Sequence, residues 1–364
     1  MIRSLRRGVS LVALIFGLLV VGALAVRALA QHQTAEALAI RTPNGIDEER
    51  FVRIGGADQW ITIRGQDRRN PLLLILHGGP GSPLSYLQRQ FEPMERHYVV
   101  VQWDQPGGGK TLARNGGLVD PRIDMARLVA DGIALSQYLR GRLHHDKIIL
   151  VGHSFGSILG AKMVQARPDL YAAFVGTGMA GRTQLEWQRW AYADLLAQTQ
   201  GAGDAKGFAE MHDGVGPPPW ADDSPQIMHL AHAARPYLPP SLGYFDHLRI
   251  LLATPHWSLS DILAVPKGMA GMLHAAVWKP EARDAYLAGP IAFTTPFLVI
   301  QGGDDKTTPV VLAHPWFERV QAPAKAFVVI PGQGHEALSW DNAAFTQALD
   351  ANLPPLLKTP VAQP

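Results

Sequence analysis

A serine flanked by glycines follows directly on an apolar run near the middle of this sequence. Residues 148–150 are apolar and lead into Val151-Gly152-His153-Ser154-Phe155-Gly156-Ser157, which predicts a strand that turns sharply into a helix with Ser154 at the bend. Such a turn is tight enough to demand glycine two residues to either side of the serine, and it pushes the hydroxyl out over the end of a sheet. Ser154 is therefore expected to be an exposed nucleophile. For the pentapeptide alone, a plain glycine- and serine-rich loop is the alternative.

Composition narrows the chemistry that this chain can use. Of 364 residues, 47% are hydrophobic and 18% charged, which is typical of a globular protein with a sizeable core in one large domain or two ordinary ones. The formal net charge of +2 is too small to suggest a nucleic-acid surface. The sequence contains no cysteine, which excludes a thiol nucleophile, a thiolate zinc site and disulfides. A serine or a carboxylate must therefore do any covalent work.

The N-terminus predicts contact with a membrane. Arg3, Arg6 and Arg7 precede an uncharged apolar stretch over residues 8–26, which Arg27 closes, and this stretch is long enough to cross a bilayer. The excess of arginine before the stretch predicts a cytoplasmic N-terminus and an extracytoplasmic domain. The small residues 28–30 also resemble a cleavage site, so the alternatives are an uncleaved anchor and a signal peptide with export.

The rest of the chain predicts an α/β protein with a doubly wound, mostly parallel sheet. Alternation over residues 51–65 predicts a hairpin, and continuous apolar runs predict buried strands at 72–76, 98–103, 148–151, 174–176, 297–301 and 327–330. Helical spacing occurs at 85–96, 123–142, 157–166 and 342–353. The expected organisation is a signal or anchor at 1–30, a spacer at 31–50, a core in two parts at 51–180 and 291–364, and a helical cap inserted at 181–290.

A base and an acid follow the serine in suitable places. Serine is a poor nucleophile until a neighbouring histidine takes its proton and a carboxylate orients that histidine. In a sheet with such a serine turn, the acid and the histidine come later, each in the loop after a strand. The loop after 297–301 contains Asp304 and Asp305, and the loop after 327–330 contains His335. His335 is the predicted base, and both aspartates are candidates for the acid.

Donors for an oxyanion are predicted at two strand ends. The run 72–76 ends in His77-Gly78-Gly79-Pro80-Gly81, a turn that brings backbone N–H groups to the end of the sheet. The N–H groups of Gly79 and Phe155 are the predicted pair. Gly107-Gly108-Gly109-Lys110-Thr111 suggests a phosphate-binding loop, but Asp104 stands where that motif requires glycine. Because metal-ligand spacings are also missing from the sequence, neither a metal nor another cofactor is expected.

These motifs together resemble the α/β-hydrolase superfamily, and within it the proline iminopeptidase branch. The resemblance rests on His77-Gly78-Gly79-Pro80-Gly81, on Asp104-Gln105-Pro106-Gly107-Gly108-Gly109-Lys110-Thr111 and on Gly152-His153-Ser154-Phe155-Gly156-Ser157, and it spans residues 51–353. It favours Asp305 as the acid, since residues 302–309 then read Gly-x-x-Asp-x-x-x-Pro as in those relatives. The sequence departs from the family at Pro106 and Thr111, where arginine and serine are usual, and in its serine turn, which more often reads Gly-Gly-Ser-Trp-Gly.

The resemblance implies a serine hydrolase that removes N-terminal proline from small peptides. Members of the branch hold the cationic substrate N-terminus with carboxylates of the cap, for which Glu186 and Glu210 are the candidates, although a surface position is the alternative for each. An esterase or lactonase for small uncharged esters is the second hypothesis, because a cap with several tryptophans suits uncharged ligands. A non-catalytic binding protein of the same fold is the third.

Overall fold

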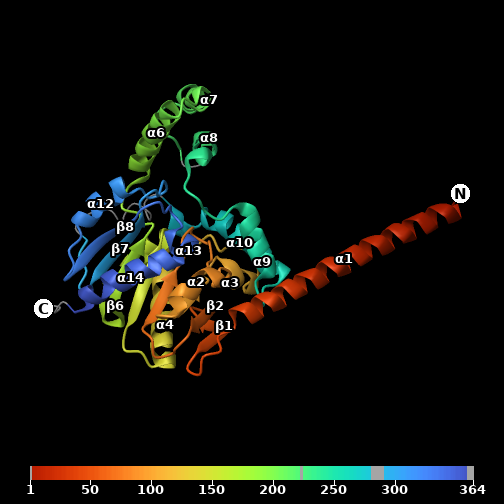
Figure 1. Ribbon diagram of the computed structural model, residues 1–364, viewed down its shortest axis with the longest axis horizontal. Coiled ribbons are helices and arrows are strands. Elements are labelled where there is room, and N and C mark those ends of the chain that lie inside the picture. The colour runs from red at the N-terminus through yellow and green to blue at the C-terminus, as the bar shows by residue number, and fades with distance from the viewer. Residues whose placement is uncertain (1, 222–223, 280–290, 359–364) are drawn as a thin grey trace.

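One sheet forms the centre of the computed structural model, which describes residues 2–221, 224–279 and 291–358 (Figure 1). The order of its eight described strands is β1-β2-β4-β3-β5-β6-β7-β8. The β1–β2 and β2–β4 pairs are antiparallel and the others are parallel, which confirms the predicted mostly parallel sheet. The strands are β1 Ile46–Ile54, β2 Ala57–Gly65, β3 Leu72–Leu76, β4 Val99–Trp103, β5 Ile148–His153, β6 Tyr171–Thr177, β7 Phe297–Gly302 and β8 Lys325–Ile330.

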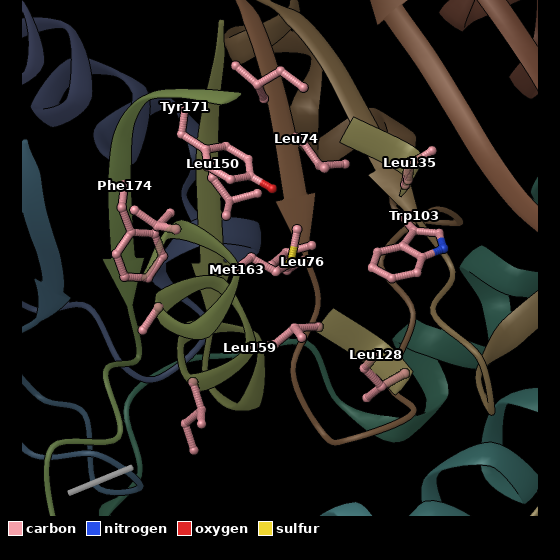
Figure 2. Close-up of a cluster of buried hydrophobic side chains, with 14 of the residues drawn as sticks. Leu74, Leu76, Trp103, Leu128, Leu135, Leu150, Leu159, Met163, Tyr171 and Phe174 are labelled. Carbon is pink, nitrogen blue, oxygen red and sulfur yellow. The ribbon is translucent and has the colours of Figure 1, made fainter. Parts of the chain in front are cut away.

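Helices cover both faces of this sheet. One face packs against α4 (Met125–Leu143) and α5 (Phe155–Ala166), and the other packs against α2 (Gln88–Glu95) and α14 (Asn342–Leu357). Figure 2 shows the first interface, where Leu150 and Tyr171 of the sheet meet Leu159 and Met163 of α5. The central strand β3 is buried along its whole length because it is covered on both sides, which explains its uninterrupted apolar run.

The start of the sheet differs from the predicted spacer at 31–50. Helix α1 (Ile2–Leu38) continues to Leu38, and β1 already begins at Ile46. Ile46 is buried and pairs with Gly65, whereas most of β1 is half-buried or exposed. β1 is an edge strand with polar side chains, so its first residues show no apolar run from which a strand could be predicted.

The segment after β6 consists largely of helices. These are α6 Gln184–Gly201, α7 Ala205–Ala209, α8 Pro225–Ala234, α9 Tyr244–Ala253 and α10 Leu259–Met272. Helices α6 and α8 share a small apolar cluster with the helical turn Glu210–Val215, and helices α6 to α8 extend away from the sheet (Figure 1). The expected boundaries of the cap at 181 and 290 stay a prediction, and the second lies outside the described residues.

Helix α1 projects from the molecule beside α9 (Figure 1). Its part from Leu14 to Leu38 is long and apolar enough to cross a membrane, and an 18-residue stretch within it has a mean hydropathy of 2.1 and no buried residue. Near the folded domain, Arg27 and Gln31 donate hydrogen bonds to the carbonyl oxygen of Trp257, and Gln31 also donates to that of Thr254. The apolar helix is thus joined to the segment between α9 and α10.

Candidate active site

Ser154 stands at a sharp turn between β5 and α5. It has a φ of +54°, which non-glycine residues rarely adopt, and its N–H donates to the carbonyl oxygen of Thr177 at 2.9 Å. The glycines on either side are required for space. A Cβ on Gly152 would lie 2.4 Å from the carbonyl oxygen of Gly156, and a Cβ on Gly156 would lie 2.2 Å from that of Leu76. The close approach of α5 to β3 therefore produces the strained turn that presents Ser154.

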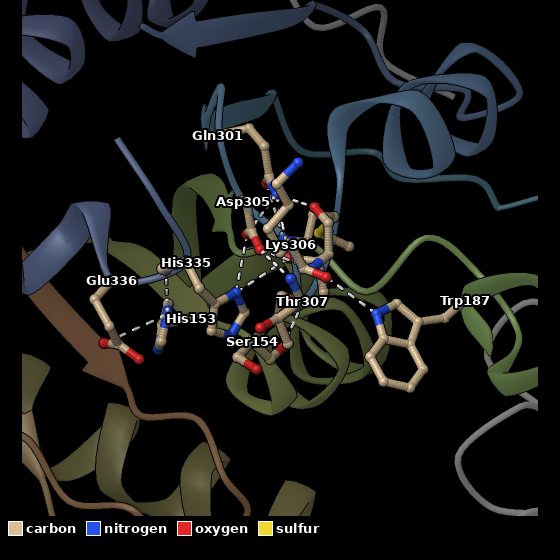
Figure 3. A network of polar contacts seen from close by, with 12 residues as sticks. His153, Ser154, Trp187, Gln301, Asp305, Lys306, Thr307, His335 and Glu336 are labelled. Carbon is tan, nitrogen blue, oxygen red and sulfur yellow. Dashed lines mark hydrogen bonds and ion pairs between the residues drawn. The ribbon is translucent and has the colours of Figure 1, made fainter. Parts of the chain in front are cut away.

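His335 and Asp305 meet next to this turn. The Nδ1 atom of His335 lies 2.9 Å from Oδ2 of Asp305. The His335 ring packs against the ring of His153, with centroids 4.9 Å apart, and a Cβ on Gly178 would lie 2.9 Å from its Cε1 atom. His153 precedes Ser154 in the chain, and Gly178 follows the Thr177 that binds Ser154, so the imidazole lies at the serine turn, as Figure 3 shows.

Asp305 is held by a complete set of donors. Its Oδ1 accepts the N–H groups of Thr307 and Thr308, each at 2.8 Å. Its Oδ2 accepts the Thr308 hydroxyl at 2.7 Å and the Gln301 amide at 3.0 Å, in addition to His335. Asp305 is only 2% exposed, whereas Asp304 is exposed and its N–H bonds the carbonyl oxygen of Gln333. Of the two candidate acids, Asp305 is the one that the structure brings to His335.

The negative charge of Asp305 and the positive charge of protonated His335 stabilise each other. Burial would raise the pKa of Asp305, but the nearby His335 and the hydrogen bonds to its carboxylate outweigh burial and lower the pKa to about 2. Burial would lower the pKa of His335, but the Asp305 carboxylate outweighs burial, and the net direction is upward from 6.5. Asp305 is thus ionised at neutral pH, and it stabilises the imidazolium that forms when His335 takes a proton.

The glycine-rich turn after β3 lies directly against Ser154. A Cβ on Gly78 would be 2.8 Å from Cβ of Ser154. Gly79 follows with a φ of +111°, and Phe155 is the first residue of α5, whose N–H has no partner within the helix. Neither the Gly79 N–H nor the Phe155 N–H bonds a protein acceptor within the part of the chain that the structure describes. Both groups are therefore available to a bound oxyanion.

His77 fixes this turn to the loop after β4. Its Nε2 accepts the Gln105 N–H at 3.1 Å, so its Nδ1 carries the proton and donates to the carbonyl oxygen of Gly78 at 2.9 Å. The Gln105 side chain also donates to the carbonyl oxygen of His77. Burial lowers the pKa of His77 to about 4, so the ring stays neutral. The two motifs that contain His77 and Gln105 were recognisable in the sequence. The contact between these residues joins the loops after β3 and β4, and no sequence pattern indicated it.

His153 and Gln301 are further residues whose roles the sequence did not indicate. His153 Nε2 lies 2.9 Å from the carbonyl oxygen of His335 and so holds the loop that carries the imidazole. Gln301 donates to Asp305, while its Oε1 accepts the N–H of Met179. Both links join elements that are far apart in the sequence, and only the assembled sheet brings them together.

A metal ion would compete with these contacts. His153, His335 and Glu336 offer ligand atoms within 4.8 Å of one another. Two of these residues are already in use, because His153 Nε2 bonds the His335 carbonyl oxygen and His335 Nδ1 bonds Asp305. A metal on the remaining nitrogen of His335 would remove it as a base for Ser154. The donor set fits proton transfer better than metal binding.

Glu186 and Glu210 have other contacts in the structure. Glu186 forms a capping box at the start of α6, where its carboxylate accepts the N–H of Thr183 at 2.7 Å and its hydroxyl at 2.8 Å. Glu210 lies 3.9 Å from Nδ1 of His229 and 4.0 Å from that of His232. Neither carboxylate is shown in contact with Ser154 or His335, and a substrate role for them stays a prediction.

Helix α6 is attached to the loop that carries Asp305. Trp187 donates to the carbonyl oxygen of Lys306 at 3.1 Å (Figure 3), and the Lys306 ammonium lies 3.0 Å from the Asp194 carboxylate. Between α6, α8 and this loop is a mostly apolar cavity of about 200 Å³, lined by residues that include Trp187, Trp190 and Leu230. The loop that contains Asp305 therefore also lines this apolar cavity.

This chain is similar to a known protein family and to individual proteins. The family model described as the alpha/beta hydrolase fold matches residues 71–342. A probable aminopeptidase of Bacillus subtilis strain 168 is 28% identical over 292 residues, which cover 78% of this chain and 89% of that protein.

Two solved structures are similar over most of the chain. The proline iminopeptidase of Mycobacterium smegmatis superposes with a TM-score of 0.57 at 19% identity, covering 85% of this chain and 99% of that one. A bacterial membrane phospholipase A also reaches 0.57, at 16% identity over 98% of this chain and 100% of that one. At these identities the two structures show a common fold.

Proposed function

The chain belongs to the α/β-hydrolase family, as a serine hydrolase of its proline iminopeptidase-like branch, and from this we propose that Ser154, His335 and Asp305 form its catalytic triad. The observation that carries the proposal is the contact of His335 with Asp305 beside the strained turn of Ser154. Gly79 and Phe155 supply the oxyanion hole through their N–H groups.

The reaction follows from these positions. His335 takes the hydroxyl proton of Ser154 as the oxygen attacks the substrate carbonyl, and the resulting oxyanion accepts hydrogen bonds from Gly79 and Phe155. The imidazolium, paired with Asp305, then gives the proton to the leaving group, and an acyl-enzyme forms on Ser154. Water attacks the acyl-enzyme with the help of the same histidine, which releases the acid and restores the serine.

The substrate that we propose first is a small peptide with an N-terminal proline. The matching relatives named aminopeptidase or proline iminopeptidase support it. Such a substrate carries a cationic amine, for which Glu186 and Glu210 are the proposed partners. Replacing either by glutamine should then raise KM for a proline arylamide and leave KM for a neutral aryl ester unchanged, because only the first substrate is cationic.

Small uncharged esters are the second candidate substrates. The cavity beside the Asp305 loop favours them, since most of its lining is apolar and includes tryptophan and leucine side chains. A direct comparison of kcat/KM decides between the two classes. Faster turnover of a proline arylamide than of a matched neutral aryl ester supports the peptidase, and the reverse order supports the esterase.

A membrane-anchored location is proposed for the domain. The exposed apolar part of α1 and its attachment through Arg27 and Gln31 support an anchor that stays with the domain, and export after signal cleavage is the alternative. The excess of arginine before the apolar stretch supports an extracytoplasmic domain.

A further inference from the structure

Helix α10 carries an apolar face that no part of the described chain covers. Leu259, Leu263, Pro266, Ala270 and Leu273 are spaced by four, three, four and three residues, which places them on one side of the helix, and all five are exposed. Leu263 is 58% exposed and Leu259 is 50% exposed. The opposite side, with Val265 and Met272, is buried. An amphipathic helix normally turns its apolar side inward, so α10, with apolar residues on both sides, needs a second apolar environment.

The N-terminus of α9 extends this surface. Tyr244 and Phe245 are 75% and 81% exposed, and their rings contact each other edge to face with centroids 5.7 Å apart. Together with Leu259, Leu263 and Leu273, these two aromatic residues form what we call the docking face. Exposed aromatic side chains of this kind are enriched where proteins meet the headgroup region of a bilayer.

The docking face is continuous with the apolar part of α1. Ala23, Leu24 and Val26 of α1 line a groove whose other wall is formed by residues of α9 and the start of α10, namely Phe245, Leu248, Leu252 and Leu259. The groove has a volume of about 690 Å³ and is almost entirely apolar. In Figure 1, α9 lies beside the point where α1 leaves the domain.

This contact fixes the level of α9 relative to a bilayer. The apolar stretch of α1 ends at Arg27, and Ala23 lies about one helical turn before it. If α1 crosses the bilayer, Ala23 to Val26 lie at its outer boundary, and side chains that share a groove with them lie there too. Phe245 and Leu259 then reach the headgroup region without any movement of the domain.

The charges around the docking face agree with a lipid surface. Arg27 and Arg249 line the groove, and Lys267 is exposed on α10. The acidic residues of these helices are used within the protein, since Asp246 accepts the Gly243 N–H and Asp261 accepts the Ser258 N–H and hydroxyl. The exposed cations Arg249 and Lys267 beside an apolar face suit anionic headgroups.

We propose that the docking face inserts into the headgroup region of the bilayer that α1 crosses, so that the domain lies on the membrane surface instead of hanging from a free tether. This inference rests on the proposed retention of α1 as an anchor. It also places the catalytic site near the lipid. The buried side of α10 covers the oxyanion turn, because a Cβ on Gly81 would lie 2.7 Å from the carbonyl oxygen of Gly268 and 2.9 Å from Cγ of Met272.

Spin labelling tests the docking face on the full chain. The sequence has no cysteine, so the variants Phe245→Cys and Leu263→Cys each carry a single labelling site. Val311→Cys is the matched control, because Val311 is apolar and 59% exposed on α12 (Val310–Glu318), across the sheet from α1. Each nitroxide-labelled protein is reconstituted in vesicles of phosphatidylcholine and phosphatidylglycerol, and collisions with oxygen and with a water-soluble nickel chelate are measured by power saturation.

The expected ratio of oxygen to nickel collisions at residues 245 and 263 is several times that at residue 311, because oxygen concentrates in lipid. Ratios equal to the control overturn the proposal. Poor access to both reagents, with dipolar broadening between labels, identifies a second copy as the partner and also overturns it. Loss of residues 1–30 from the intact mass overturns it as well.

A fluorophosphonate reaction on the same vesicles separates this inference from the proposed function. Protein that reacts at Ser154 but shows water-exposed labels overturns the docking face and leaves the hydrolase intact. Labels in lipid on protein that does not react support the docking face and overturn the hydrolase.

Discussion

Among the described residues, four donate hydrogen bonds to the Asp305 carboxylate, and His335 is the one of these four that we propose to pass a proton on to a substrate. The other three, Gln301, Thr307 and Thr308, hold the carboxylate in one orientation. The imidazole therefore has a fixed tautomer, in which Nδ1–H donates to the Asp305 carboxylate and the unprotonated Nε2 is the proposed base. The proposed chemistry depends on this single buried contact.

Replacing Asp305 by asparagine tests that contact. Neutral His335 is the active form, and the carboxylate raises its pKa above 6.5, so wild-type kcat/KM should fall as the pH drops through a value above 6.5. In Asp305→Asn the acid limb should move to lower pH, and the plateau should fall on the order of 10⁴-fold, as in other serine triads. Asp304→Asn is the control, and it should keep the acid limb and the plateau of kcat/KM of the wild type. An unchanged acid limb in Asp305→Asn would contradict the assignment.

Asp104 should make stability depend on pH in the opposite direction from an ordinary ion pair. Burial raises its pKa from 3.8 to about 7, although its carboxylate accepts the Lys110 N–H at 2.8 Å. Between these two pH values the folded state holds a proton that the unfolded state releases, so stability falls as the pH rises. Asp104→Asn should therefore gain more in melting temperature over wild type at pH 8 than at pH 5. An equal difference at both pH values would refute this.

The proposed catalytic groups lie close together because each follows a parallel strand of the same half of the sheet. Ser154 follows β5, Asp305 follows β7 and His335 follows β8, and the carboxyl ends of parallel strands lie along one edge of the sheet. The turn that contains Gly79, the proposed oxyanion donor, follows β3, and β3 pairs directly with β5. Loops that are far apart in the sequence thus converge on one site.

The close contact of α5 with β3 can be tested at Gly156. A Cβ there would lie 2.2 Å from the carbonyl oxygen of Leu76, so Gly156→Ala must shift the turn of Ser154. We expect a loss of about 1–3 kcal/mol in the free energy of unfolding, together with a large loss of activity. Gly201→Ala on α6 is the control, because a Cβ there meets nothing within 4 Å. It should be neutral or stabilise the protein by up to about 1 kcal/mol. Equal behaviour of the two variants in urea unfolding would contradict this account of the turn.

Elements with strong local patterns could be predicted from the sequence. The run 72–76 coincides with β3, and the serine turn lies between β5 and α5, because buried parallel strands need unbroken apolar runs and the turn needs glycine. Helices with weak patterns were missed. α3 (Gly109–Arg114) has only six residues, and α12 contains Pro315, which argues against a helix.

Side-chain partners could be predicted only in part. Ser154, His335 and the pair of aspartates stand in recognisable loops, whereas the link between Gln301 and Met179 joins residues 122 apart and has no local signature. Glu186 shows the limit most clearly, since a glutamate three residues after Thr183 caps its own helix, and no sequence pattern tells whether it also contacts a substrate.

Whether the mature protein retains α1 decides where the enzyme works. Helix α1 has 37 residues, and its C-terminal part is bound to the domain through Arg27 and Gln31. We expect the mature protein to keep residues 1–30 and to stay in the membrane fraction after alkaline carbonate extraction, because an apolar helix of this length inserts stably. A soluble protein whose intact mass corresponds to a chain starting at Gln31 would show that residues 1–30 are a cleaved signal peptide.

Ser154 as an activated nucleophile is tested by reaction of the protein with a fluorophosphonate, followed by peptide mapping. We expect one phosphonate adduct per chain on Ser154, no adduct in Ser154→Ala, and strongly slowed labelling in His335→Ala, provided that both variants melt like wild type. A folded wild-type protein that stays unlabelled, or that carries its adduct on another residue, would contradict it.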